Sequence, residues 1–559
     1  PQDVQSLLKE GRDAWLDRQL QPARINDAAL AARLDSFATV QADMTDLLSD
    51  FQRDQRQRRE LAQQRNMQNL TEQQRQAVLD SVRRAEMQSM TPEERRERQM
   101  RSPQYLLSEL VSAKLTRALY SERQLEEMMT DFWYNHFNVF FGKGIDRYLI
   151  GDYERSAIRP HVFGKFRELL EATAKHPAML FYLDNATSVV PDSMNSNART
   201  QRIQVEQFRR LSARQQQEFL RRRNITREQL EQFMTQNGPN RQRGLNENYA
   251  RELMELHTLG VDGGYTQKDV VEVARAFTGW QFTRPGPRGN QDVAFVFRPQ
   301  LHDRGEKTVL GRKLPAGRGL EDGRDVLDLL ATHPATAKFI ATKLVERFVS
   351  DHPDPAFVSE LAGVFQKSGG DLRTVTRALF TSPRFYDSKV QRAKIKTPFE
   401  LVASAMRLTN ADVGLTRATV QTLRSLGHLP YSEPAPTGFP AASEDWVNSG
   451  AMLNRMNFGL ALAGNRLDGV RINSPDLVGT GQSAAAEAWV PGMLQRLLPG
   501  VETAKLQSTI LSELQKPVEI ATQPADDRTM RRNAPNAPVR DRTARALGLA
   551  LGSPEFQRK

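Results

Sequence analysis

The stretch that decides the fold is residues 246–280, NENYARELMELHTLGVDGGYTQKDVVEVARAFTGW. Apolar residues recur at helical spacing from Tyr249 to Leu259 and predict a first helix with one face against a core. Gly260 is placed to end this helix, and the glycine pair at 263–264 is placed to turn the chain. The pattern therefore predicts two helices joined by a glycine turn.

The second helix of this pair has a clear start signal. Thr266 is a residue type that caps helices, and Asp269 follows three positions later, as in a capping box. Val270, Val273, Ala274 and Phe277 then supply an apolar stripe, and the helix is expected to end at Gly279. These features predict a helix that packs on the core beside the first one.

Polar residues on the first helix exceed what packing alone requires. Asn248, Glu252 and Glu255 stand at positions i, i+4 and i+7, so they share one face. Paired carboxyl groups perform acid/base chemistry when burial raises the pKa of one of them. The alternative is an ion-paired surface, in which Arg251 pairs with Glu255 four residues later. Glu252 and Glu255 are therefore candidate catalytic residues, with Asn248 as a candidate substrate-binding residue.

The glycine turn places an acid and a phenol beside this face. Asp262 precedes the two glycines and Tyr265 follows them. A turn of this kind is either a stabilised bend or part of a substrate site with bare backbone. Tyr265 and Trp280 are able to stack on a sugar, and they are equally able to pack in a core. Asp262 is thus a third candidate catalytic residue, and the two aromatic residues are candidate binding residues.

Eight histidines limit any histidine chemistry. His302 and Asp303 lie in a loop between short expected strands, where they could act as a base and its orienting partner, ligate a metal, or form a turn. His136, within FWYNHF, and His257, at the end of the first helix, are candidate binding residues. Their alternatives are a hydrogen-bonded core histidine and a cation at a helix C-terminus. We expect no bound metal or cofactor, and the alternative is a divalent site on His136, His302 and a carboxylate.

Several motifs in order carry a family resemblance over nearly the whole chain. Residues 246–280 resemble the signature of the bacterial domain of unknown function 1800 family. The match continues with FWYNHFNVF at 132–140, MLFYLDNATS at 179–188, FRPQLHDRGEKTVLG at 297–311, HPATAKFIATKL at 333–344 and SPRFYDSK at 382–389. The resemblance implies an exported bacterial protein, often encoded beside the domain of unknown function 1501 family, which is thus an expected partner. It assigns no reaction.

Composition sets further bounds. The chain has 559 residues, 39% of them hydrophobic, and contains no cysteine. Disulfides, thiolate zinc sites and iron–sulfur clusters are thereby excluded. No apolar run approaches the ~18 residues needed to span a membrane. Together with the resemblance, these features lead us to expect a processed, exported protein that is periplasmic or secreted.

The net charge of +11 comes from two segments. Residues 51–101 hold 12 arginines against 8 acidic residues, and residues 199–243 hold 11 against 4. Both are also rich in glutamine, which is typical of solvated helical insertions, with binding to an anionic surface or polymer as the alternative. Interleaved aromatic residues are few, so nucleic-acid binding is not expected.

We expect a mainly α fold: a large multi-helix assembly with a small β-hairpin or sheet insertion around 281–314, where short alternating runs lie between Pro/Gly turns. Further helices are expected at 320–332, 334–350, 355–367, 371–381 and 396–408. The segments in order are an N-terminal helical segment (1–45), a Gln/Arg-rich helical insertion (46–101), the first helical core part (102–198), a basic helical insertion (199–243), the second core part with the β patch (244–427), a Pro-rich loop (428–446) and C-terminal helices (447–559).

Two functions from different classes fit this sequence. The first is a carbohydrate-active hydrolase that acts on an envelope or extracellular polysaccharide through its carboxylate and histidine residues. Cleavage needs two carboxyl groups, about 5–5.5 Å apart for retention and about 6.5–9.5 Å apart for inversion. Glu252 and Glu255 would lie on one side of a substrate, so the second acid is expected from Asp262 or Asp303. The second function is a non-enzymatic envelope scaffold or binding protein that uses its basic insertions.

Overall fold

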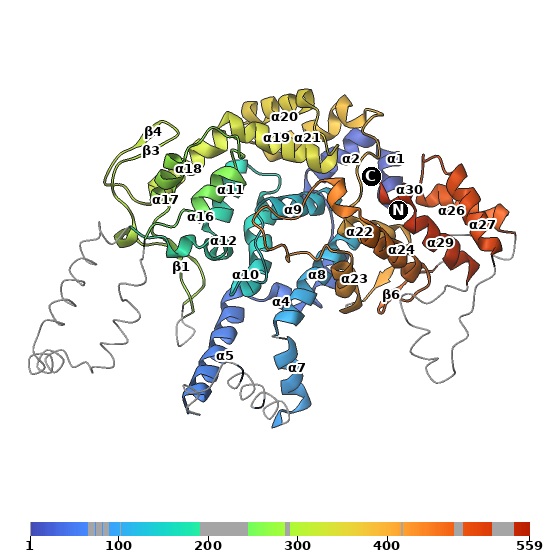
Figure 1. The fold of residues 1–559 in the computed structure, drawn as a ribbon, viewed down its shortest axis with the longest axis horizontal. Helices are drawn as coiled ribbons and strands as arrows, with labels where there is room; N and C mark the ends of the chain where they lie inside the picture. The colour runs from blue at the N-terminus through green and yellow to red at the C-terminus, as the bar shows by residue number, and fades with distance from the viewer. Residues whose placement is uncertain are drawn as a thin grey trace, which may run out of the picture. The chain divides into compact units, whose positions relative to one another are not determined.

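The computed structural model describes residues 2–64, 73, 81, 89–100, 102–190, 244–285, 291–414, 417–473, 485–516 and 541–559. Helices dominate, and the strands form small two-stranded antiparallel sheets, so the fold is mainly α as predicted (Figure 1). The chain divides into two compact units. Unit 2 is Leu170–Thr336, and unit 1 is formed by Pro1–Leu169 with Ala337–Lys559.

Unit 1 begins with helices that cover most of its first 169 residues. They are α1 (Gln2–Glu10), α2 (Arg12–Gln19), η1 (Pro22–Arg24), α3 (Ala28–Leu34), α4 (Ala38–Gln41), α5 (Met44–Gln64), α7 (Pro92–Met100), α8 (Pro103–Tyr120), α9 (Gln124–His136), α10 (Asp146–Asp152), a π-helical turn η3 (Tyr153–Ile158), η4 (Arg159–His161) and α11 (Phe166–Lys175).

The second part of unit 1 is also helical. Its elements are α19 (Pro334–Phe348), α20 (Pro355–Lys367), α21 (Leu372–Thr381), η7 (Pro383–Tyr386), α22 (Pro398–Leu408), β5 (Asp412–Val413), α23 (Arg417–Ser425), η8 (Ser443–Trp446), α24 (Ser449–Ala463), β6 (Val470–Arg471), α26 (Ala486–Leu497), α27 (Ala504–Gln515), α29 (Arg542–Gly552) and α30 (Pro554–Gln557). The helices predicted from residue 355 to 408 are all present within two residues of their expected ends.

Unit 2 contains the helix pair of residues 246–280. Its elements are α12 (Pro177–Tyr182), η5 (Asn185–Thr187), α16 (Asn248–Glu255), α17 (Gln267–Ala276), β1 (Trp280–Phe282), β2 (Phe295–Phe297), η6 (Pro299–Leu301), β3 (Lys307–Val309), β4 (Arg312–Leu314) and α18 (Leu320–Thr332). The expected sheet insertion is therefore confirmed, as two separate antiparallel pairs, β1 with β2 and β3 with β4.

Short polar caps followed by proline explain several helix starts. Thr397 caps α22, Pro398 occupies its first position, and Glu400 completes a capping box. Proline costs nothing at this position because the first amides of a helix have no partner within the helix. The box predicted for α17 is also present, with the Thr266 side chain accepting from the Asp269 amide and the Asp269 carboxylate accepting from the Thr266 amide.

Glycine allows the closest helix contact in unit 1. Helices α24 and α29 pack side by side (Figure 1). A Cβ atom added at Gly548 would lie 2.9 Å from the Cα atom of Leu460, and one added at Gly459 would lie 3.0 Å from the carbonyl oxygen of Gly548. The two backbones approach each other because these positions carry no side chain.

Some predictions fall outside the described residues. The basic insertion at 199–243 lies there entirely, as does most of the 65–88 part of the Gln/Arg-rich insertion. At the described edge of the latter, α7 begins directly after Thr91, whose amide donates to the Glu94 carboxylate at 2.8 Å. Within the described part of the chain, no helix has the length and apolar character that a membrane span requires.

Candidate functional site

Helix α16 carries the first group of predicted site residues. Its buried side consists of the predicted apolar stripe, whereas Glu252 and Glu255 are partly buried and Asn248 is exposed. The side-chain amide of Asn248 donates to the carbonyl oxygen of Leu183 at 3.4 Å. The spacing argument thus placed the two carboxylates correctly on the outer side of the helix.

The end of this helix differs from the prediction. It ends at Glu255, four residues before the predicted end at Leu259. The amide of His257 bonds to the carbonyl of Glu252 at 3.0 Å, and the amides of Leu259 and Gly260 both bond to the carbonyl of Met254. These wider turns replace the regular i→i−4 pattern, and Gly260 closes them at φ 80°. His257 is buried inside this turn, with 2% of its surface exposed.

The predicted pairing of Arg251 with Glu255 is wrong. The Arg251 guanidinium instead lies 3.3 Å from the Glu247 carboxylate, one helical turn earlier, and donates to the Gln267 side-chain oxygen at 3.1 Å. The arginine side chain therefore points toward the start of α17. This leaves the two predicted catalytic carboxylates without the basic partner expected for an ion-paired face.

Glu252 is the carboxyl group of this face with a perturbed proton affinity. Burial raises its pKa, the nearby charge of Glu255 raises it further, and Arg251 opposes the shift only in part. Within the described residues no hydrogen bond or ion pair reaches the Glu252 carboxylate. Glu255 accepts a long hydrogen bond of 3.4 Å from the Tyr265 hydroxyl. Burial and the Glu255 charge also raise the pKa of that phenol.

The glycine turn brings further candidates to the same end of α16. Asp262 is exposed, Val261 beside it is 71% exposed, and Tyr265 is partly buried. Gly264 adopts φ 81°, which a residue with a side chain rarely does. The structure therefore gathers Glu255, Tyr265 and the turn, as the sequence predicted.

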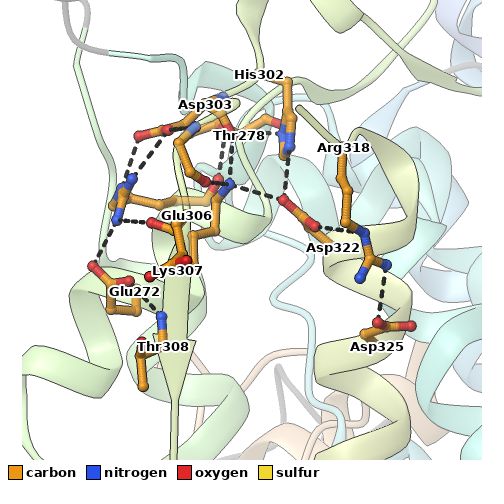
Figure 2. A network of polar contacts seen from close by, with 12 residues as sticks. Glu272, Thr278, His302, Asp303, Glu306, Lys307, Thr308, Arg318, Asp322 and Asp325 are labelled. Atoms are coloured by element: carbon orange, nitrogen blue, oxygen red, sulfur yellow. Dashed lines mark hydrogen bonds and ion pairs between the residues drawn. The ribbon is translucent and has the colours of Figure 1, made fainter. Parts of the chain in front are cut away.

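His302 lies in a closed network in unit 2 (Figure 2). Its Nδ1 atom is 2.9 Å from the carbonyl oxygen of Thr278, and its Nε2 atom is 3.3 Å from Oδ2 of Asp322. The His302 side chain has no exposed surface. Its ring thus joins the end of α17 to the first turn of α18.

Asp303 is held by an arginine fork. Two nitrogens of Arg275 reach its carboxylate at 2.8 and 3.2 Å, and the Gly305 amide donates to it at 2.8 Å (Figure 2). Burial alone would raise the pKa of Asp303, but these donors outweigh burial and lower it. A carboxylate held ionised in this way is a weak proton acceptor. Its contacts connect the predicted loop to α17.

Sequence reasoning missed the acid at the centre of the network. The Asp322 side chain has no exposed surface, and its Oδ2 atom accepts from the Lys307 ammonium at 2.8 Å. Its Oδ1 atom lies 3.2 Å from the Arg318 guanidinium, which also pairs with Asp325 at 2.9 Å (Figure 2). Burial would raise the pKa of Asp322, but the bonds from His302 and Lys307 lower it. The signal available was an acid in the first turn of a predicted helix.

Trp280 and Gly323 pack against each other beside this network. Trp280 is fully buried, in edge-on contact with Phe277 and Phe295 at 4.8 and 5.1 Å between ring centroids. A Cβ atom at Gly323 would lie 2.5 Å from the Trp280 ring. Trp280 therefore packs in the core of unit 2, which is the second of its two predicted roles, and it has no exposed face for a sugar.

His136 belongs to unit 1 and lies among aromatic rings. Trp133 and Phe137 approach it edge-on, with centroids 5.4 and 4.6 Å away. It is 9% exposed. Among the residues that the structure describes, no group of three or more His, Asp or Glu side chains is arranged to hold a metal ion.

A family model described as a protein of unknown function, DUF1800, matches residues 1–558. The chain belongs to the DUF1800 family. No curated protein and no solved structure matches this DUF1800 chain. The expected family membership is thus confirmed over essentially the whole length.

One DUF1800 motif has a clear structural role in unit 1. Asn135, in FWYNHFNVF, donates to the carbonyl oxygen of Phe439 at 2.9 Å and accepts from its amide at 2.8 Å. Asn138 donates to the carbonyl oxygens of Glu433 and Ala435 at 3.0 and 2.7 Å. The two asparagines therefore clamp the Pro-rich loop to the end of α9 by bonding its backbone.

Proposed function

We propose that this protein is an exported bacterial protein that acts on an envelope or extracellular polysaccharide, with Glu252 as its acid/base group. The observation that carries the proposal is the state of the Glu252 carboxyl. Its pKa is raised by burial and by Glu255, and none of the described residues pairs with it. Stable proteins ordinarily neutralise such a group, so an uncompensated one marks a candidate site.

The chemistry of this face supports the assignment. A carboxyl group with a raised pKa keeps its proton closer to neutral pH, which suits a general acid. Glu255 adds negative charge beside it, and Tyr265 adds a hydroxyl group. The exposed Val261 and the Tyr265 ring offer apolar surface to the CH face of a sugar. The exposed carboxyl of Asp262 is the next acid along the chain after Glu255.

Export rests on two supports. The absence of cysteine fits an oxidising compartment, where free thiols are a liability. The family resemblance also carries this expectation, together with a partner from the domain of unknown function 1501 family. The direct measurement is fractionation of the native host, with the protein expected in the periplasm or the medium.

The second function is a non-enzymatic envelope scaffold. The ion pair of Asp303 with Arg275 favours it, because it uses a candidate acid for cohesion. A scaffold predicts polysaccharide binding without turnover. An enzyme predicts release of new reducing ends.

The test compares Glu252→Gln with Glu247→Gln at the N-cap of the same helix. Glu247 already pairs with Arg251, so its substitution controls for a lost charge near the site. On a panel of envelope and extracellular polysaccharides, the first variant should lose about 10²-fold or more of the reducing-end release while keeping its fold. The control should keep its activity.

Two results would contradict the assignment. One is turnover that survives Glu252→Gln. The other is binding without turnover by the unmodified protein, which would favour the scaffold. Thermal unfolding of both variants must accompany the assay, because loss of folded protein would imitate loss of catalysis.

A further inference from the structure

Four basic side chains border a small cavity in unit 1. Its volume is about 30 Å³, and it lies between α8 and the helical stretch that starts at α10. The polar side chains in its wall are Gln41, Lys114, Arg117, Arg155, Arg159, Glu154 and Tyr431. Cations that gather around one cavity normally have carboxylates nearby to compensate their charge.

Three of the four cations have carboxylate partners in the protein. The Tyr431 hydroxyl adds a hydrogen bond of 2.8 Å to Glu154, which completes the coordination of that acid. The ion pairs are Lys114 with Asp131 (3.1 Å) and Glu154 (3.4 Å), Arg159 with Glu127 (2.7 Å) and Glu154 (3.3 Å), and Arg155 with Asp152 (2.5 Å).

Arg117 is the exception. It is partly buried, and within the described residues its guanidinium makes no hydrogen bond or ion pair. Burial, followed by the charge of Arg159, lowers its pKa, and the carboxylates of Glu127 and Glu154 oppose this only in part. Those two acids already serve other cations. The fork of Arg117 therefore has free donors at the edge of the cavity.

A wider groove adjoins the same side chain. It has a volume of about 560 Å³, and Arg117 forms part of its wall as well. Small and aliphatic residues make up six of the ten remaining wall residues, among them Ala28, Ala31 and Leu34, and no aromatic ring contributes. The other four are Arg24, Asn26, Asp27 and Arg123. This lining suits an aliphatic body better than a sugar, which usually packs on aromatic rings.

We propose that Arg117 binds the carboxylate of an aliphatic acid whose body lies in the groove over α3. A water needs about 10–15 Å³ of such space, so the small cavity has room for about two water-sized groups. A carboxylate has two oxygens, whereas a phosphate has four. The planar guanidinium bonds both carboxylate oxygens at once. This site lies in unit 1 and is independent of the Glu252 face.

Titration calorimetry at pH 7 measures the binding of octanoate, the probe, to the full-length protein. Octanamide has the same body without the charge, acetate has the charge without the body, and inorganic phosphate tests the other oxyanion. We expect octanoate to bind more tightly than all three. Arg117→Met should weaken octanoate binding about 10-fold or more, since a charge-assisted fork is lost.

A matched variant separates this site from general loss of positive charge. Arg424 is exposed, and among the described residues its guanidinium bonds only to the Gln421 side chain, so Arg424→Gln should change octanoate affinity less than about 2-fold. Arg117→Met should not lower the unfolding temperature, because it removes an uncompensated, partly buried charge. Arg117→Lys keeps the charge without the fork and should bind with intermediate affinity.

Several outcomes would overturn the proposal. These are equal affinity of the unmodified protein and Arg117→Met for octanoate, equal affinity for octanoate and octanamide, and preference for phosphate. An Arg117→Met variant that fails to fold would show that the arginine is structural. In that case Arg117→Lys decides, and octanoate affinity equal to that of the unmodified protein would reject the fork.

Discussion

Unit 2 places two carboxyl groups in opposite electrostatic settings. Asp322 is fully buried and surrounded by Lys307, His302 and Arg318, and its pKa is lowered. Glu252 is only partly buried, yet its pKa is raised, because burial and a neighbouring acid act on it without a bonded cation. Depth of burial therefore does not decide the state of a carboxyl group. The number of donors that reach it does.

The comparison also separates stability from function. The network around Asp322 uses each charge to connect α17, the β3–β4 pair and α18. The α16 face leaves like charges adjacent, which lowers stability and keeps a proton available. A protein retains such an arrangement most readily where a ligand or a reaction uses it.

Asp322→Asn should have the largest effect on this comparison. It keeps the shape of the side chain but leaves Lys307 as a buried, uncompensated cation, which typically costs about 3–5 kcal/mol. Denaturant unfolding measures this loss. The control is Asp325→Asn, at the 27% exposed end of the same arginine bridge, which should cost less than about 1 kcal/mol. Equal losses in the two variants would show that the network does not act as a buried unit.

Gly323→Ala should have the next largest effect. Its new methyl group would meet the Trp280 ring at 2.5 Å inside the core of unit 2, and overpacking of this kind costs about 1–3 kcal/mol. Gly363 also lies inside a helix, α20, but nothing approaches its Cβ position within 4 Å. Gly363→Ala should therefore stabilise by about 0.5–1 kcal/mol. Thermal unfolding of the pair tests the packing, and two changes of the same sign would contradict it.

The smallest expected effect is the pH dependence of folding stability, which has opposite signs for the carboxyl groups of Asp322 and Glu252. The folded pKa of Asp322 is lowered, so its stabilisation is present above its unfolded pKa of about 3.9 and is lost as pH falls below it. The folded pKa of Glu252 is raised, so its ionisation destabilises the fold above about pH 4.3.

Glu252→Gln should therefore stabilise slightly at pH 7, by no more than about 0.5 kcal/mol, with the gain vanishing below about pH 4. The destabilisation caused by Asp322→Asn should instead shrink as the pH falls. Unfolding curves at pH 7 and pH 3.5 measure both slopes. If the stabilities of the two variants changed with pH in the same way, the electrostatic difference between Glu252 and Asp322 would be absent, and the assignment of Glu252 would lose its support.

Local patterns in the sequence predicted much of this fold. Thr266 and Asp269 predicted the start of α17 correctly, because a capping box involves only neighbours in the chain. The predicted end of α16 was wrong, because the wide turns that end the helix depend on burial of the residues around His257. The β5–β6 pair was missed because Asp412–Val413 and Val470–Arg471 are two residues each and far apart in sequence.

In the candidate site too, features set by neighbouring residues were predicted, whereas contacts between distant residues were not. The α16 face follows from helical spacing, so Glu252, Glu255 and the adjacent turn were found. The partners of His302 are Thr278, directly after α17, and Asp322, in the first turn of α18, and no spacing rule connects them. Arg117 was missed for a related reason, since its importance lies in the absence of a partner, which a sequence does not display.

The asparagine clamp on the Pro-rich loop has a consequence for digestion by proteases. A protease holds its substrate as an extended strand and must bond the same backbone atoms that Asn135 and Asn138 already occupy at Phe439, Glu433 and Ala435. Residues 428–446 lack helix and strand except at η8, yet we expect the part from Glu433 to Phe439 to resist cleavage while the clamp holds. Surface loops are commonly the first places where a folded protein is cut, and here two amide side chains shield one.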